Sequence, residues 1–174
     1  GLFYNLIDDL IATEMNPMSL GQEGMRFRYA NIESARTLGA DASMSVDDIW
    51  GFSATLRYHL GMAQNIDKNR PLAGRSRHRA SLSVSYQYLP WALSMSAQAA
   101  WHSPRPFYIL RSFSEDEARV DAASYVMSDC FIEKRFVGSL ALWLRAENLT
   151  NAGDVDYLPV RPRSVYAGLR VYYD

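Results

Sequence analysis

Cysteine, long apolar runs and an excess of one charge are all nearly absent from this sequence of 174 residues. The one cysteine, Cys130, excludes a disulfide within the chain and a zinc site built from several cysteines. No apolar stretch reaches the roughly 18 to 20 residues that a transmembrane helix needs. A net charge of −1 provides no general basic field for binding nucleic acid. These absences exclude a helical membrane protein and argue against a nucleic-acid partner.

The sequence instead alternates apolar and polar residues in segment after segment. The alternation is clean in five segments, residues 50–62, 79–88, 91–102, 139–147 and 164–174. Because successive side chains of a strand point to opposite faces, each segment is predicted to be a strand with one apolar and one polar face. Less regular alternation extends the prediction to residues 26–46, 124–136 and 1–13, where a bulge would explain the mixed parity. The sequence therefore predicts an all-β chain of about eight antiparallel strands.

The connections between these strands fall into two classes of length. Short connections are expected near residues 47–49, 89–91 and 137–138. Long connections are expected at residues 14–25, 64–77, 104–123 and 149–162. Tight turns at one end and long polar loops at the other are typical of outer-membrane β-barrels. An even number of strands would place both termini at the short-turn side, in the periplasm.

Two further features favour a transmembrane β-barrel over a soluble β-rich binding module. The apolar faces stay nearly pure for about 9 to 11 residues, the length of a tilted strand that crosses a bilayer. Aromatic residues gather at the ends of these faces, as expected for a lipid-facing girdle of Trp50, Phe52, Tyr88, Trp91, Trp101, Phe136 and Tyr173. Lys134 lies on an apolar face only where its strand nears a turn, so its side chain can reach water. A protein that needed no detergent would favour the soluble module instead.

Five stretches, in order along the whole chain, resemble the barrel of TonB-dependent outer-membrane receptors. The stretch "GLFYNLIDDLI" (1–11) is similar to a Phe-Tyr-Asn strand of the family, and "FRYANIESARTLGADASMSV" (27–46) to a strand with Asn and then Thr-x-Gly. The stretch "NRPLAGRSRHRASLSVSYQY" (69–88) resembles a segment with Pro-Leu and later His-Arg. The last two, "LWLRAENLTNAGDVDY" (142–157) and "RPRSVYAGLRVYYD" (161–174), resemble an Asn-Leu-Thr-Asn segment and the closing strand.

The resemblance implies that residues 1–174 are the C-terminal portion of a receptor barrel that has twenty-two strands in full. Such receptors import scarce nutrients such as ferric siderophores, with energy passed on by TonB. The family's plug domain and TonB-binding box would lie N-terminal to this stretch. The expected partners are therefore outer-membrane lipid, the remaining strands and plug in the same or a separate chain, and TonB indirectly.

A stand-alone eight-stranded barrel with a structural or adhesive role is the alternative. The interior of such a small barrel must be filled by side chains. Ser81, Ser83, Ser85, Ser94 and Ser96 all belong to predicted polar faces and would leave voids there. Small inward side chains fit a wide barrel better, where they would form a smooth wall against a plug.

One long connection, residues 103–124, combines cationic and aromatic side chains. Such a combination suits an anionic, aromatic metal chelate. The predicted substrate-binding residues are Arg105, Phe107, Tyr108, Arg111 and, at the mouth, His102. The alternative is a solvated loop that packs on its neighbours. No nucleophile–base order, paired carboxylates or metal-ligand spacing stands out, so we expect no catalytic site, no cofactor and no metal site, and "NLT" at 148–150 is expected to remain unglycosylated.

Overall fold

The computed structural model describes residues 1–15, 27–110, 117–136, 139–153 and 156–172, and its regular structure is almost entirely β-strand. The strands are β1 (Leu2–Met15), β2 (Phe27–Ile49), β3 (Phe52–Asn65), β4 (Arg70–Pro71), β5 (His78–Tyr88), β6 (Leu93–His102), β7 (Arg105–Leu110), β8 (Glu117–Ala122), β9 (Tyr125–Arg135), β10 (Leu140–Glu147) and β11 (Ser164–Val171). One turn of 3-10 helix, η2, covers Leu89–Trp91. Within the described ranges no helix has the length and apolarity needed to cross a membrane.

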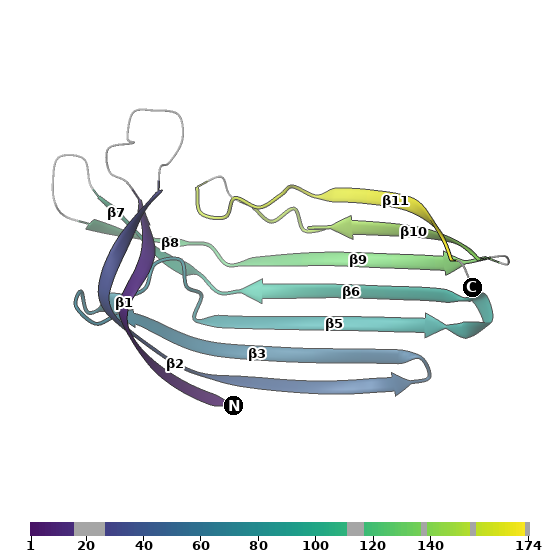
Figure 1. Cartoon of the computed structure of the whole chain (residues 1–174), viewed down its shortest axis with the longest axis horizontal. Coiled ribbons are helices and arrows are strands. Elements are labelled where there is room, and N and C mark those ends of the chain that lie inside the picture. Colours follow the sequence, from purple (N-terminus) through teal and green to yellow (C-terminus); the bar gives the residue numbers. More distant parts are fainter. Residues whose placement is uncertain (16–26, 111–116, 137–138, 154–155, 173–174) are drawn as a thin grey trace. The chain divides into compact units, whose positions relative to one another are not determined.

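The main sheet follows the order β1-β2-β3-β5-β6-β9-β10-β11, with β4 paired to β3 (Figure 1). Each of the eight segments predicted as strands is a strand of this sheet, which confirms the all-β, antiparallel prediction. β7 and β8 form a separate two-stranded antiparallel sheet. The sequence predicted a loop over 104–123, so this hairpin corrects that prediction. Each of its strands has six residues, too few for the alternation of apolar and polar side chains to indicate a strand.

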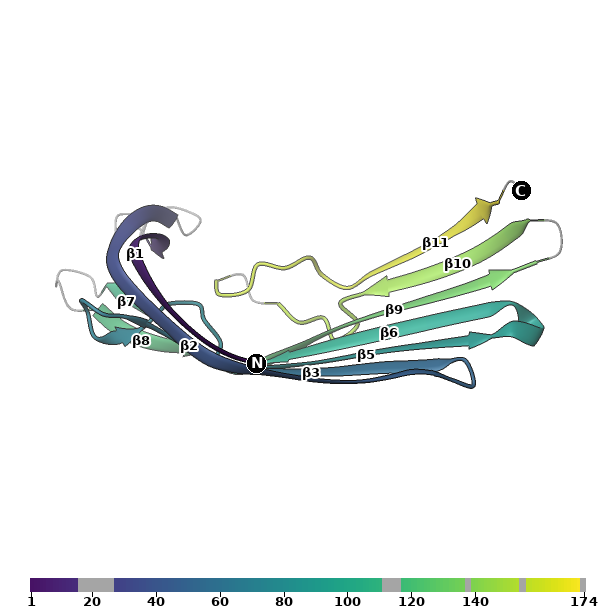
Figure 2. The ribbon, with the colours of Figure 1, turned by 60° about the horizontal axis from the view of Figure 1, so that its bottom comes forward.

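The chain divides into two compact units. Unit 1 comprises residues 1–41, 59–78 and 102–124, and unit 2 comprises residues 42–58, 79–101 and 125–174. Unit 2 contains β9, β10 and β11, which lie side by side in both views (Figures 1 and 2). Unit 1 contains β1 and the β7–β8 hairpin.

A two-residue turn joins β2 to β3 in unit 2. Trp50 and Gly51 have φ of 54° and 80°, the positive values that a type I′ hairpin turn requires at both central positions. A Cβ at Gly51 would also collide with the carbonyl oxygen of Gln87, whose N–H donates to the Gly51 carbonyl at 2.8 Å. The turn therefore lies one residue beyond the predicted connection at 47–49, while η2 occupies the predicted connection at 89–91.

The pairing of the first strand with β2 does not contain the expected bulge. β1 and β2 keep one register from the Leu2–Ala40 pair to the Met15–Phe27 pair, so no residue is inserted. Asp9 instead adopts a φ of 56°, a left-handed conformation that Asp tolerates better than most residues. The backbone distortion is local and leaves the pairing intact.

Candidate functional site

The described residues bury almost no hydrophobic core. The buried apolar residues are four alanines, a leucine and a proline: Ala35, Leu72, Pro106, Ala122, Ala141 and Ala146. No large side chain of the described part is fully buried. Most of the large apolar side chains are therefore on the surface, the reverse of a soluble domain of this size.

In unit 2 these exposed side chains occupy one face of the strands, here called the apolar face. It consists of the even positions of β5, β9 and β10 and the odd positions of β6 and β11. Its exposed members are Leu82, Tyr88, Trp101, Val126, Ile132, Leu140, Leu142, Leu144, Val165, Leu169 and Val171. Of the predicted girdle residues, Trp50, Phe52, Tyr88, Trp91, Trp101 and Phe136 are all exposed, with Trp50 at 94%, and Tyr173 lies outside the described residues.

The opposite, polar face of unit 2 is hollowed. Small polar side chains from β3, β5 and β6 line a cavity of about 550 Å³, among them Ser53, Thr55, Ser83, Ser85, Ser96 and Gln98. Phe131 stacks on Trp143 with 6.3 Å between ring centroids, and Phe131 lines the same cavity. The Trp143 ring also covers Gly168, its cross-strand partner, where a Cβ would come within 2.5 Å of the ring. The polar face thus combines a wall of short hydroxyl side chains with an aromatic patch formed by Phe131 and Trp143.

Asp129 joins this wall to the loop that follows β10. One oxygen of its carboxylate accepts a hydrogen bond from Gln98 Nε2 and the other from the backbone N–H of Asn148, each at 2.8 Å. Asn148 is only 4% exposed. Its amide donates to the carbonyls of Ala152 and Arg161 at 2.8 and 2.9 Å and accepts from the Ala152 N–H at 2.8 Å. The "NLT" sequence therefore organises a loop, because the Asn148 amide is engaged by the backbone around it.

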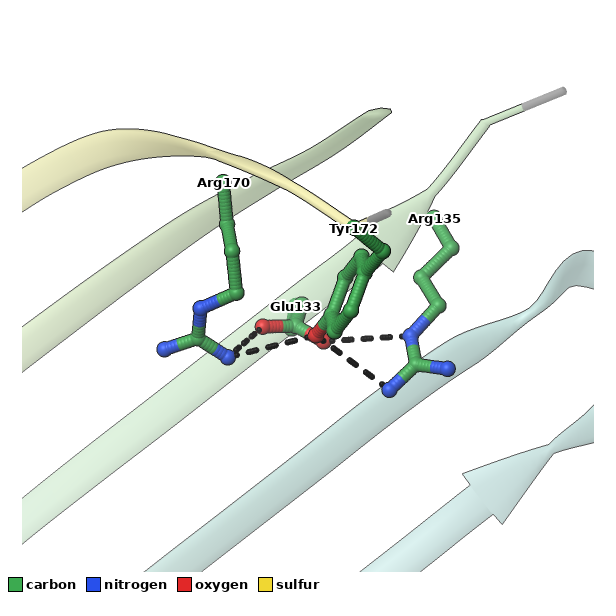
Figure 3. Close-up of polar contacts among 4 residues, drawn as sticks. All are labelled: Glu133, Arg135, Arg170 and Tyr172. Atoms are coloured by element: carbon green, nitrogen blue, oxygen red, sulfur yellow. Dashed lines mark hydrogen bonds and ion pairs between the residues drawn. The ribbon is translucent and has the colours of Figure 1, made fainter. Parts of the chain in front are cut away.

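A second polar cluster ties the last strand to β9 across β10 (Figure 3). Glu133 is 5% exposed and pairs with Arg170 Nη1 at 2.7 Å and, more loosely, with Arg135 Nε at 3.4 Å. The Tyr172 hydroxyl donates to Glu133 at 2.9 Å and accepts from Arg135 and Arg170 at 3.2 and 3.3 Å. The Arg135 guanidinium also lies 4.3 Å from the centroid of the Tyr172 ring.

The cluster exists because β10 contributes a small residue between its members. Ala141 is the cross-strand partner of both Arg135 on β9 and Arg170 on β11, and it is fully buried. A methyl group is short enough for Arg170 to reach Glu133 over it, whereas Arg135 lies two residues from Glu133 on β9 itself. Sequence reasoning missed this cluster, since the four residues appear only as scattered polar-face positions until the strand register is known.

Unit 1 contains an aromatic–histidine pair. Phe3 and His59 stack with 5.6 Å between centroids, and His59 Nδ1 and Asp41 Oδ1 form a hydrogen bond of 2.6 Å. Both rings cover glycines, since a Cβ at Gly39 would meet the Phe3 ring at 2.6 Å and one at Gly61 would meet His59 Nε2 at 2.6 Å. Across the described ranges no three His, Cys, Asp or Glu side chains converge as a metal site would require.

The structure separates the predicted substrate-binding residues of unit 1. Arg105 and Phe107 share one face of β7, with the Arg105 guanidinium 5.6 Å from the Phe107 ring centroid. Tyr108 points to the other face, where its hydroxyl donates to the Pro71 carbonyl at 2.9 Å and Arg70 lies 3.9 Å from its ring centroid. His102 is the half-buried last residue of β6, and Arg111 lies outside the described residues. The contact of any of them with a substrate stays a prediction.

Comparisons with known proteins agree with this architecture. The TonB dependent receptor-like β-barrel family matches residues 1–149. The ferripyoverdine receptor of the Pseudomonas aeruginosa outer membrane has a TM-score of 0.70 and 15% identity, over 98% of this chain and 24% of that one. The FrpB iron transporter from Neisseria meningitidis has a TM-score of 0.64 and 17% identity, over 97% of this chain and 26% of that one. The copper transporter OprC has a TM-score of 0.64 and 13% identity, over 97% of this chain and 27% of that one.

At these identities the solved structures show the fold alone, and the chain spans about a quarter of their length. None of the curated proteins matches the chain. The family match covers most of the sequence and confirms the resemblance read from its five stretches. The chain belongs to the TonB-dependent receptor-like β-barrel family.

Proposed function

We propose that this chain forms part of the barrel wall of an outer-membrane receptor that imports a scarce nutrient, such as a ferric siderophore, with energy from TonB. The chain would be the C-terminal portion of the barrel, with both termini in the periplasm. The remaining strands and the plug domain would come from the same polypeptide or from a separate one. The proposed role is transport, with no catalytic step.

The exposed apolar face of unit 2 is the observation that carries this proposal. In water, a continuous surface of leucine, valine, isoleucine and aromatic side chains would exceed the few hundred Å² that soluble monomers leave uncovered. In a bilayer the same surface meets acyl chains at no such cost. The exposed rings Trp50, Phe52, Tyr88, Trp91, Trp101 and Phe136, together with Tyr173, would then be the girdle at the membrane–water interfaces.

The first and last strands support a larger assembly. In the described residues β1 pairs only with β2, and β11 pairs only with β10. An unpaired strand edge in lipid leaves backbone groups without hydrogen bonds, at several kcal/mol for each group. Each edge therefore needs a partner strand, which further strands of a wider barrel would supply.

The polar face fits the inner wall of such a barrel. Its serines and threonine leave the cavity of about 550 Å³ open, where a narrow barrel would need bulky side chains. A wide barrel fills this space with another domain. The wall would then face the plug.

A substrate-binding role is proposed for His102, Arg105, Phe107, Tyr108 and Arg111. Arg105 and Phe107 support it best, because a guanidinium and a ring on one face of β7 suit an anionic, aromatic chelate. Tyr108 contributes by fixing the hairpin to Pro71. The substrate would be contacted by one face of the hairpin while the other face holds it in place.

Native mass spectrometry of the protein released from detergent micelles tests the proposal. We expect a complex heavier than the chain's own 19.7 kDa, with partner strands and a plug in one polypeptide or two. A folded species at the chain's own mass would instead indicate the small stand-alone barrel. A folded protein that needs no detergent would contradict the membrane role.

Binding of iron-loaded catecholate and hydroxamate siderophores tests the substrate site separately. In the assembled receptor, replacing Arg105 and Phe107 together by alanine should weaken binding, measured by quenching of tryptophan fluorescence. Arg119→Ala on β8 is the matched control, since Arg119 is paired with Asp121 at 2.9 Å. Equal affinity in the double variant and the control would exclude Arg105 and Phe107 from the site.

A further inference from the structure

The apolar face of unit 2 carries one charged residue. Within unit 2, strands β5, β6, β9, β10 and β11 place Ala, Leu, Val, Ile, Met, Tyr, Trp, Ser and Cys side chains at the apolar-face positions, and His78, which begins β5, belongs to unit 1. Lys134, the penultimate residue of β9, is the exception. A charge on the lipid-facing surface of a barrel is costly at mid-membrane and tolerated only near the interfaces, so its position and surroundings need an explanation.

Aromatic rings surround the Lys134 ammonium. It lies 6.0 Å from the centroid of the Trp91 ring and 5.9 Å from that of Phe136. It also donates a hydrogen bond to the Trp91 backbone carbonyl. Trp91 and Phe136 are themselves exposed, so the rings and the ammonium form one surface at the short-turn end of the strands.

The nearby carboxylate of Glu133 cannot neutralise Lys134. Glu133 belongs to the polar face, where Arg170, Arg135 and Tyr172 already surround it. In the described ranges no Asp or Glu occupies an apolar-face position of β5, β6, β9, β10 or β11. An ammonium has three N–H donors, and the Trp91 carbonyl uses one of them.

We propose that Lys134, Trp91 and Phe136 form a binding site for the phosphate of an anionic phospholipid in the leaflet at the short-turn side. The ammonium donates its remaining hydrogen bonds to the headgroup phosphate, and the two rings lie at the level where headgroups meet acyl chains. The Trp91 carbonyl holds the ammonium at this level. The inference rests on the proposed membrane location, and it adds a lipid preference that the location alone does not require.

Native mass spectrometry with two lipids of equal acyl chains tests the site. The complete receptor that contains this chain is exchanged in detergent with phosphatidylglycerol or phosphatidylcholine, and the retained lipids are counted. The wild type should retain phosphatidylglycerol in preference. Lys134→Met should lower this preference about fivefold, since one lysine near a membrane surface attracts anionic lipid by roughly 1 kcal/mol, whereas Lys134→Arg should keep it.

The sequence has one other lysine, Lys68, which supplies a matched control. Lys68 lies in the turn between β3 and β4 and is not one of the apolar-face residues, so Lys68→Met should leave the preference unchanged. An unchanged preference in Lys134→Met, or an equal loss in Lys68→Met, would overturn the site while leaving the membrane role intact. A wild-type protein that retains neither lipid and needs no detergent would instead contradict both proposals.

Discussion

The two faces of the sheet in unit 2 depend on different kinds of interaction. The apolar face has Ile132, Leu142 and Leu169 exposed on neighbouring strands, and their common property is hydrophobicity. On the opposite face of the same strands, Glu133 and Arg170 meet at 2.7 Å across Ala141, and their geometry depends on the register of three strands. One face therefore tolerates exchange among apolar residues, while the other depends on particular side chains at particular positions.

A charge placed in the middle of the apolar face should have the largest effect. Leu82 lies near the middle of β5 and is 44% exposed. Leu82→Arg should lower the free energy of unfolding in the membrane by about 2 to 4 kcal/mol, the cost of an arginine facing lipid at mid-bilayer. The folded fraction after reconstitution is measured from heat-modifiable mobility on gels. The free energy of unfolding is measured by urea titration in vesicles.

The neighbouring residue provides the control. Ser83 lines the cavity on the polar face, so Ser83→Arg adds the same side chain one position away, among polar side chains instead of lipid. We expect a smaller loss of stability than for Leu82→Arg. If both variants lose stability equally, the two faces do not differ in their surroundings and the lipid-facing assignment is wrong.

Removing the side chain that organises the loop after β10 should have a smaller effect. Asn148→Ala deprives the carbonyls of Ala152 and Arg161 and the N–H of Ala152 of their partner. Unsatisfied buried groups cost about 1 to 3 kcal/mol, and because water reaches part of this loop we expect about 2 kcal/mol in local stability. Hydrogen exchange of residues 149–153 measures it.

Asn151→Ala separates the hydrogen bonds from backbone strain. Asn148 and Asn151 both have a φ of 50°, so alanine is disfavoured equally at either position. Asn151 accepts one hydrogen bond, from the Arg163 N–H at 3.1 Å. Equal exchange in Asn151→Ala and Asn148→Ala would mean that strain, rather than the Asn148 amide, controls the loop.

The sequence predicts which face of a strand a residue occupies far better than it predicts which residue lies beside it on the next strand. Period-two alternation located β3, β5, β6, β10 and β11, because parity within a strand needs no knowledge of other strands. The family resemblance added the receptor family to which the strands belong. The pairing of Arg135, Ala141 and Arg170 depends instead on cross-strand register, which turn geometry and packing decide together.

The predicted substrate loop shows the same limit. Composition singled out Arg105, Phe107 and Tyr108 together, but a strand sends successive side chains to opposite faces. In the structure, Arg105 and Phe107 therefore share one face of β7. Tyr108 lies on the other face, where it contacts Arg70 and Pro71. The hairpin was not recognised, because six-residue strands with a Pro and two arginines carry a weak alternation signal.

The smallest predicted effect concerns the Glu133 cluster. Glu133→Gln keeps an acceptor for the Tyr172 hydroxyl but removes the charge that Arg135 and Arg170 share. Both arginines are half exposed, so water screens the loss, and we expect the pairing of β11 to weaken by about 1 kcal/mol. Hydrogen exchange of residues 164–171 should therefore accelerate about fivefold. Glu147→Gln, which removes the ion pair between Glu147 and Arg145 at 2.8 Å within β10, should change exchange less. If the two variants are indistinguishable, the cluster adds nothing beyond a surface ion pair, and apolar packing and backbone pairing alone hold the last strand.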